Sequence, residues 1–474
     1  MRPGTRITSV RQDALTIDQH GHLRELRGIR GLEPAFRLLL RQSGADLDEL
    51  REQIARTGPP GGSIAGVDRL GRALGMLVSG CAVELACMAG GDELLAAAPV
   101  GPLASFDFSS FGTGDVALGR FRLSRFACAH RAAGNLVVDC PHLSVRITVT
   151  ASEAAAAIAA LAEPSSAVEL AARLPFISPA VVREVLAVLA AAGAAARVGP
   201  DGRLAEDCDP NLAQREFHDV LMHSRSRYGL TDGPIGGVFP HAGVIPSSPA
   251  VKPAMAEPLI DLPRPDMDQL MTAGPSLARV METRRSVRAY GDRKLTADEV
   301  GEFLYRVARA RAVAGPRPDD PHGYETSDRP YPSGGAGYDL EIYLLVRECE
   351  GIAPGLYHYQ PMAHAVSELP CEPATVNRQL RKAYYANGCQ VIPQVLFILA
   401  SRFSRLSWKY QGIAYATTLR NVGVLYEAMY LVATAMGLAP CALGSGDSAS
   451  FGAMTSLDPL VESSVGEFML GTRP

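Results

Sequence analysis

The sequence predicts a protein of several domains, each built from both helices and strands. Its 474 residues are too many for one hydrophobic core, which suggests two to four domains. In the first half of the chain, segments with strand-like alternation precede segments with helical spacing. Eight prolines between Gly233 and Pro265 rule out a long helix or a central strand there. We therefore expect that stretch to be an extended linker.

Composition and charge narrow the class of protein. A net charge of −4 gives no indication of a nucleic-acid or membrane-surface partner. The nine cysteines are odd in number and never spaced as Cys-x-x-Cys, which favours a reducing compartment and no structural metal. No apolar signal core follows Met1, and Gly437 and Pro440 interrupt the most hydrophobic stretch, 428–443. We expect a cytoplasmic protein without a membrane span.

The first 205 residues contain the same order of elements twice. In the first unit, strand patterns are followed by helical patterns at 33–42, 47–56 and 67–79. In the second unit, three strand patterns precede helices, the last of which has Ser178 as its N-cap and Pro179 at its first position. This order suggests a diverged internal repeat, and the second unit reads as a small winged-helix module.

Winged-helix modules often bind DNA, and histidines often bind metals. The segment 178–198 carries only two basic residues, Arg183 and Arg197, which is too few for a phosphate-binding face. His218 and His223 are five residues apart and do not share one helix face. A structural or protein-contact role is therefore expected for the module, with no nucleic acid and no metal.

Two segments of the last 200 residues carry candidate chemistry. Arg284, Ser286 and Arg288 alternate, so in an extended segment they project to one side and could receive a phosphate monoester. A solvated basic stretch would look the same. Further on, the glycines at 334, 335 and 337 crowd a turn before an apolar strand. Glycine allows a backbone to approach a ligand closely, although a tight loop before a core strand is equally consistent.

Together these motifs resemble the flavin-dependent nitroreductase superfamily. The segment 332–343 resembles its SagB-type branch, the azoline dehydrogenases of ribosomal peptide biosynthesis. The resemblance covers residues 275–474 and reaches the neighbourhoods of 122–125 and 216–227. It implies an α+β fold with a mostly antiparallel central sheet for residues 271–474, and a homodimer that binds FMN at its interface.

The resemblance also implies roles for individual residues. The FMN phosphate and ribityl chain would contact Arg284, Ser286 and Arg288, and Arg473 would reach the phosphate. The isoalloxazine ring of the flavin would lie along Pro332, Ser333, Gly334 and Gly335. A second segment would face the flavin and consists of Leu443, Gly444 and Ser445.

The Lys409–Tyr410 pair precedes a long apolar helix predicted over 413–436 and ended by Gly437. By itself the pair would be a surface lysine beside a half-buried tyrosine. In the azoline dehydrogenases a Lys-Tyr pair at this place is catalytic. The implied reaction passes a hydride to flavin N5 and a proton to the Lys409–Tyr410 base, with the flavin re-oxidised by oxygen.

Two residues depart from the pattern of the branch. Gly337 stands where a larger residue is more common, so we expect a wider pocket floor. Asp339 stands where proline is common, so we expect a looser start of the following strand.

The upstream units resemble peptide clamps, which bind leader peptides by adding a strand to a sheet edge. We predict one such winged-helix module at 1–104, a second at 105–205, a helical segment with the linker at 206–270, and the nitroreductase-like domain at 271–474. The expected partners are an azoline-containing precursor peptide and the cyclodehydratase of the same pathway. A degenerate clamp that serves only as scaffold remains an alternative.

Two other functions compete with azoline oxidation. One is an NAD(P)H-dependent flavin reductase of small molecules, against which the long N-terminal half and the Lys409–Tyr410 pair argue. No Gly-x-Gly-x-x-Gly fingerprint for a nicotinamide cofactor is evident. The other is a catalytically inactive, peptide-binding scaffold subunit, which would stay colourless after incubation with FMN.

Overall fold

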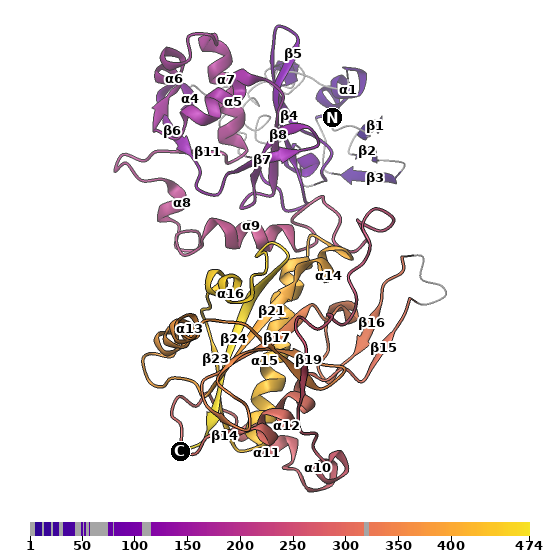
Figure 1. The fold of residues 1–474 in the computed structure, drawn as a ribbon. Helices are drawn as coiled ribbons and strands as arrows, with labels where there is room; N and C mark the ends of the chain where they lie inside the picture. The colour runs from indigo at the N-terminus through magenta and orange to yellow at the C-terminus, as the bar shows by residue number, and fades with distance from the viewer. Residues whose placement is uncertain are drawn as a thin grey trace. The chain divides into compact units, whose positions relative to one another are not determined.

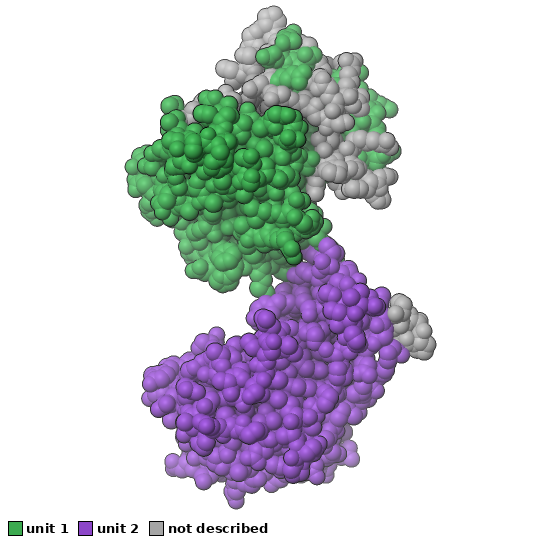
Figure 2. Space-filling view, turned by 45° about the horizontal axis from the view of Figure 1, so that its top comes forward, with its two compact units in different colours: residues 1–233 green, residues 234–474 purple. Residues whose placement is uncertain are grey.

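The structure is a computed structural model of the chain (Figure 1). It describes residues 5–11, 14–19, 22–27, 32–42, 49–50, 52–53, 56, 74–78, 80–106, 115–316 and 322–474. The chain divides into two compact units, residues 1–233 and 234–474, which Figure 2 colours separately.

The first unit begins with a small antiparallel sheet. Strands β1 (Thr5–Val10), β2 (Ala14–Gln19) and β3 (His22–Arg27) pair in sequence order, and helix α1 (Glu33–Gln42) follows. Leu15, Ile17 and Phe36 are buried in the core that this sheet shares with α1. The predicted helix at 33–42 is confirmed, while those at 47–56 and 67–79 lie largely outside the described residues.

The described remainder of the first unit contains two sheets and several helices, the first of which is the short α4 (Asp115–Leu118). Five antiparallel strands lie in the order β4 (Leu85–Ala89), β5 (Asp92–Pro99), β9 (Val145–Val149), β8 (Asn135–Cys140) and β7 (Cys128–Ala132). A second sheet has the order β10 (Ser165–Ser166), β6 (Arg120–Leu123) and β11 (Ala195–Arg197). The helices after α4 are α5 (Ser152–Ala160), α6 (Ala167–Arg173) and α7 (Pro179–Ala191), followed by α8 (Ala205–Cys208) and α9 (Phe217–Arg225).

The predicted start of α7 is confirmed. The Ser178 hydroxyl accepts a hydrogen bond from the Val181 amide at 3.3 Å, and Pro179 occupies the first helical position. The apolar face of α7, including Val182, Val185 and Leu189, is buried. The assignment of winged-helix modules stays a prediction.

The second unit is organised around a seven-stranded sheet in which all neighbouring strands are antiparallel. Antiparallel pairing was expected for this half of the chain and is confirmed. The strand order is β13 (Leu259–Asp261), β20 (Ala365–Leu369), β19 (Gly355–Gln360), β17 (Leu340–Val346), β21 (Val395–Arg402), β24 (Glu462–Thr472) and β23 (Leu438–Leu443).

Helices cover both faces of this sheet (Figure 1). Alternate residues of β17 enter different cores: Leu344 and Val346 pack with α12 (Ala297–Ala308) and α15 (Ala414–Ala435), while Leu345 packs with α13 (Pro373–Ala386) and α16 (Ser448–Thr455). A strand between two helical layers is buried on both sides, which explains the continuous apolar run of β17.

The structure corrects the expected linker. Residues 234–270 belong to the second unit, because the division between the two units falls after Gly233. Strand β13 adds to the edge of the central sheet, and β12 (Gly236–Gly237) pairs with β22 (Tyr410–Gln411). Prolines are compatible with edge strands and loops, because those backbone positions need not donate to a sheet. The proline count excluded a central strand, but it did not exclude packing.

The structure also bears on the state of the cysteines, on metal binding and on membrane spans. All nine cysteines are free thiols. Within the described ranges, no group of three or more histidine, cysteine, aspartate or glutamate side chains could hold a metal ion. None of the helices in the described part of the chain combines the length and hydropathy that a membrane span requires.

Candidate active site

The structure brings the glycine-rich turn and the Lys409–Tyr410 pair together. Lys409 Nζ donates a hydrogen bond to the carbonyl oxygen of Gly335 at 3.0 Å. Gly335 has a φ of 58°, and a Cβ atom there would lie 2.1 Å from Tyr410 Oη and 2.7 Å from Lys409 Nζ. Only glycine satisfies both the backbone conformation and the available space. The turn, residues 332–337, is called the glycine loop below.

A buried hydrogen-bond network holds the glycine loop. Asn421 Oδ1 accepts from the Gly334 amide at 3.0 Å, and Asn421 Nδ2 donates to Asp339 Oδ1 at 2.7 Å. The second oxygen of Asp339 accepts from Ser401 Oγ at 2.7 Å and Thr418 Oγ1 at 2.8 Å. The expectation that Asp339 loosens the start of β17 is therefore wrong. Its fully buried carboxylate ties the strand to β21 and α15.

Space around the glycine loop is already filled on its inner side. A Cβ at Gly334 would lie 2.4 Å from Thr417 Cγ2, and one at Gly337 would lie 2.6 Å from Leu406 Cδ2. Leu406 occupies the volume beside Gly337, so the expectation of a wider pocket floor is wrong. Pro332 and Gly335 are exposed, so the outer side of the loop is open to a ligand.

Tyr410 is half-buried, as the sequence suggested, and burial raises the pKa of its phenol. The pair follows α14 (Phe403–Ser407), and Tyr410 begins the short strand β22, after which α15 starts at Ala414. Lys409 Nζ lies 4.9 Å from the ring centre of Tyr324 and 5.7 Å from that of Phe239. Sequence reasoning missed both aromatic residues, because neither belongs to a motif and both are distant from Lys409 in the chain.

The alternating arginines and serine form a second cluster. They follow α11 (Leu277–Thr283) in an extended segment, which lies beside β23 because the Val287 amide donates to Pro440 O at 2.8 Å. Ser286 Oγ lies 2.8 Å from Tyr430 Oη, and Arg284 Cζ lies 5.3 Å from the centre of the Tyr430 ring.

The remaining members of this cluster are Arg288 and Arg473. Arg288 contacts the Cys441 thiol, whose pKa is raised by burial and lowered in part by this arginine. Arg473 Nε donates to Leu438 O at 3.0 Å, and the preceding residue, Thr472, accepts from the Gly291 amide at 3.1 Å. We call Arg284, Ser286, Arg288 and Arg473 the phosphate cluster. Ser286, Arg288 and Arg473 border β23, and Arg284 lies over the ring of Tyr430 on α15. Three guanidinium groups and a hydroxyl suit a phosphate monoester.

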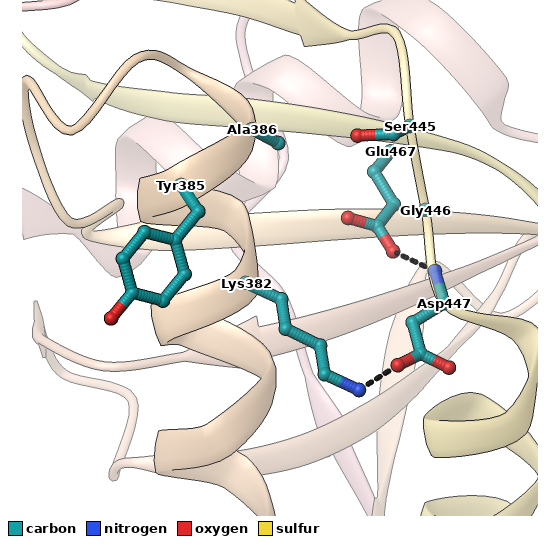
Figure 3. A pocket seen from close by; sticks show the side chains of 7 residues that line it. All are labelled: Lys382, Tyr385, Ala386, Ser445, Gly446, Asp447 and Glu467. Carbon is teal, nitrogen blue, oxygen red and sulfur yellow. Dashed lines mark hydrogen bonds and ion pairs between the residues drawn. The ribbon is translucent and has the colours of Figure 1, made fainter.

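A cavity of about 390 Å³ lies beside the predicted flavin-facing residues 443–445 (Figure 3). Its lining comes from α13, the loop after β23, and β24: Lys382, Tyr385, Ala386, Ser445, Gly446, Asp447 and Glu467. Ser445 therefore faces this cavity, and Gly444 next to it is exposed. Leu443 is buried at the end of β23.

Sequence reasoning missed the three charged residues of this cavity, Lys382, Asp447 and Glu467. Glu467 Oε1 accepts from Gln379 Nε2 at 2.7 Å and from the Asp447 amide at 3.3 Å, and burial raises the pKa of Glu467 to about 7. Lys382 forms an ion pair with Asp447 and donates to Ser450 Oγ at 2.8 Å. Glu467, which directly precedes the apolar run 468–470 of β24, is a local signal that could have identified this site.

The predicted site residues do not form one cluster within a single chain. Thr417 and Asn421, near the start of α15, contact the glycine loop, whereas Tyr430, near its end, contacts the phosphate cluster. The helix rises 1.5 Å per residue, so Thr417 and Tyr430 are about 20 Å apart along its axis. Lys409 and the phosphate cluster therefore lie toward opposite ends of α15.

The sheet, the phosphate cluster and the glycine loop define a nitroreductase-like oxidoreductase domain. Residues 281–472 match the nitroreductase family, and residues 121–232 match the family described as cyanobactin oxidase ThcOx. The chain thus contains a nitroreductase-family domain preceded by a ThcOx domain. The match to the nitroreductase family includes both Lys409 and the glycine loop, and it ends one residue before Arg473.

Particular relatives share parts of the chain. A protein of Methanocaldococcus jannaschii named as a nitroreductase is 29% identical over 186 residues, covering 39% of this chain and 84% of the relative. The microcin B17-processing protein McbC of Escherichia coli is 32% identical over 117 residues, covering 23% of this chain and 42% of McbC. A chain of the E. coli microcin synthetase McbBCD complex with truncated pro-MccB17 has a TM-score of 0.33 and 22% identity, covering 43% of this chain and 74% of that chain.

Proposed function

We propose that this protein is an FMN-dependent dehydrogenase that oxidises thiazoline or oxazoline rings in a ribosomally made peptide to the aromatic azoles. The observation that carries the proposal is the hydrogen bond from Lys409 to Gly335, because it joins the proposed base to the loop expected along the flavin ring. The similarities to a cyanobactin oxidase and to a microcin-processing protein support a peptide substrate.

The residues present fit FMN. The phosphate cluster offers several cationic donors and a hydroxyl beside β23, and the exposed outer side of the glycine loop leaves room for a flat ring. Leu443, Gly444 and Ser445 would face the flavin from the loop after β23. When bound, FMN supplies the acceptor for the hydrogen and two electrons that leave the azoline ring.

The chain's own residues handle the proton. Aromatising the ring removes two hydrogens from adjacent carbons, one with its electron pair and one as a proton. We assign acceptance of that proton to the Lys409 amine. The raised pKa of Tyr410 keeps its phenol protonated at neutral pH, so it can donate a hydrogen bond to the ring nitrogen. Both side chains are only half-buried, which gives a bound ring access to them.

The active form is proposed to be a homodimer. Tyr415, Leu419 and Val424 on α15 are exposed by 51%, 40% and 36%, which is unusual for apolar residues of a central helix. None of the residues of α10 (Met267–Ala273) is buried, and Met271 is 72% exposed. A second copy covering these faces would let the glycine loop of one chain complete the phosphate cluster of the other.

The first unit is proposed to recruit the substrate. Its five-stranded sheet ends in two edge strands, β4 and β7, either of which could accept an added strand from a leader peptide. A cyclodehydratase that makes the azoline rings is the second expected partner, since the oxidation must follow ring formation.

One experiment tests the function directly. The purified protein is loaded with FMN and incubated with an azoline-bearing peptide, and mass spectrometry follows the loss of two hydrogens per ring. NADPH consumption without any peptide would instead favour a small-molecule flavin reductase. A protein that stays colourless after incubation with FMN would point to a scaffold subunit.

A further inference from the structure

Aromatic rings from separate parts of the chain surround the amine of Lys409. Its Nζ lies 4.9 Å from the ring centre of Tyr324, 5.5 Å from that of Tyr410 and 5.7 Å from that of Phe239. The Gly335 carbonyl oxygen accepts its hydrogen bond. Ring faces and a carbonyl oxygen all stabilise an ammonium group, so this arrangement suits the charged form that Lys409 takes after accepting a proton.

Phe239 is held at this position by its backbone. The Phe239 amide donates to the Lys409 carbonyl oxygen at 3.0 Å, immediately after the pairing of β12 with β22. Its φ of 51° lies in the left-handed region, which is rare and costly for a bulky residue. Its ring stacks on His322 at 4.0 Å and meets Trp408 edge-on at 5.8 Å. A strained backbone fixed this tightly indicates that the ring position matters.

The segment that carries Phe239 is anchored beyond it as well. We call residues 236–250 the strap. Buried guanidinium groups hold its end, with Arg405 Nη1 donating to Ser248 O at 2.7 Å and Arg402 Nη1 to Pro249 O at 2.8 Å. Trp408 Nε1 donates to Ile245 O at 2.6 Å. The strap is therefore fixed to the chain on both sides of Lys409, from Arg402 to Gln411.

We infer that Phe239 and Tyr324 are positioning residues, which hold Lys409 Nζ against the glycine loop and stabilise its ammonium form. The inference rests on the proposed function, because it assumes that Lys409 takes the ring proton. It makes the strap a part of the active site, although no motif marks this segment. Phe239 is the more informative position, since its ring reaches Lys409 from a segment predicted to be only a linker.

Amine labelling tests the inference without relying on activity. The chain has only four lysines, Lys252, Lys294, Lys382 and Lys409, so peptide mapping can follow each one. The FMN-loaded protein is treated with an N-hydroxysuccinimide ester of acetic acid, which acylates neutral amines, and Lys294, which is exposed, serves as the internal reference. Phe239→Leu should increase the labelling rate of Lys409 about fivefold relative to Lys294.

Variants of matched chemistry complete the test. Phe239→Tyr keeps the ring face and should restore wild-type labelling, and Phe176→Leu makes the same change at a 64% exposed position of the first unit. In azole formation, Phe239→Leu should lower kcat with little change in KM, because Lys409 Nζ is no longer held against the glycine loop. His322→Ala, which removes the ring stacked on Phe239, should raise Lys409 labelling in the same direction.

The outcomes separate this inference from the proposed function. Unchanged labelling of Lys409 in folded, flavin-retaining Phe239→Leu would overturn the positioning role. Increased labelling, with full azole formation in both Phe239→Leu and Lys409→Ala, would support the positioning but remove Lys409 from the chemistry. If Phe239→Leu does not retain flavin, the labelling rate of Lys409 relative to Lys294 in His322→Ala decides whether the positioning role holds.

Discussion

Asn421 donates a hydrogen bond to the buried carboxylate of Asp339 at 2.7 Å, and the same side chain accepts from the Gly334 amide. One residue of α15 thus joins the start of β17 to the glycine loop. The loop is held by the core of the domain, although two of its residues are exposed. This arrangement presents a fixed backbone surface to a ligand, so that little entropy is lost in ordering the loop when the ligand binds.

Removing Asn421 should therefore loosen the loop. Asn421→Ala leaves Asp339 without one of three donors and frees the Gly334 amide, so we expect a loss of about 1–3 kcal/mol in the free energy of unfolding. Urea denaturation measures the loss, with Arg420→Ala, on the exposed side of the same helix, as the control. A stability equal to that of the control would show that the network is not needed to hold the fold.

The catalytic assignment predicts a loss of chemistry without a loss of cofactor. Lys409→Ala should lower azole formation by about 10²–10⁴-fold, the usual contribution of a general base, while bound FMN stays at the wild-type level. Lys294→Ala, at an exposed lysine outside the site, is the matched control. Full azole formation in both Lys409→Ala and Tyr410→Phe would contradict the assignment.

The role of the phosphate cluster in FMN binding can be tested with two variants at neighbouring arginines. Arg284→Ala should weaken FMN binding about tenfold to a hundredfold, because a charge-assisted contact to a phosphate is lost. Arg285→Ala changes the neighbouring residue, which is exposed and alternates to the other side of the extended segment. Fluorescence titration with FMN gives both dissociation constants. Equal weakening in the two variants would mean that the effect is one of net charge alone.

The buried Glu467 predicts a pH dependence of stability. Its pKa of about 7 in the folded protein exceeds the ordinary value of 4.5, so the folded state keeps a proton that the unfolded chain loses. The contribution of Glu467 to the free energy of unfolding should fall by about 1.4 kcal/mol per pH unit as the pH rises from about 4.5 to about 7. Glu467→Gln should lack this fall and be roughly 3 kcal/mol more stable relative to wild type at pH 8 than at pH 4.

Denaturant titrations at several pH values test this prediction, with the exposed Glu427→Gln on α15 as the control. A wild-type curve parallel to that of Glu467→Gln across this pH range would exclude Glu467 as the titrating group.

Sharing of the site between two copies can be tested by complementation. At an FMN concentration that saturates the wild type but lies well below the dissociation constant of Arg284→Ala, both Arg284→Ala and Lys409→Ala should have almost no activity alone. Mixing and reassembling them should restore about a quarter of wild-type activity, since half of the dimers are mixed and each mixed dimer has one intact site. Azole formation after subunit exchange is the measurement. Absence of any recovery, with exchange verified by native mass spectrometry, would mean that each site is built within one chain.

Local sequence was sufficient for many individual elements. The N-cap expected at Ser178 is formed, with the Ser178 hydroxyl accepting from the Val181 amide at 3.3 Å. The helix predicted over 413–436 is α15, and Gly437 follows it with a φ of 71°. These features depend on residues within a few positions of each other, so spacing alone identifies them.

Long-range packing was beyond the reach of sequence patterns. The expectations for Gly337 and Asp339 were wrong because each concerned the space around a residue, and that space is filled by Leu406 in one case and by hydrogen-bond donors from β21 and α15 in the other. The strap was missed for a related reason. Its prolines limit its own conformation but give no information about what it packs against.

The sequence by itself determined the residue types of the site: an alternating arginine–serine segment, a glycine loop before a buried strand, and a Lys–Tyr pair before a long helix. Only the tertiary structure decided which of them meet. Lys409 contacts Gly335 across 74 residues of chain, and the phosphate cluster lies toward the other end of α15. Such contacts follow from the packing of α15 on the central sheet, a cooperative property that no local periodicity encodes.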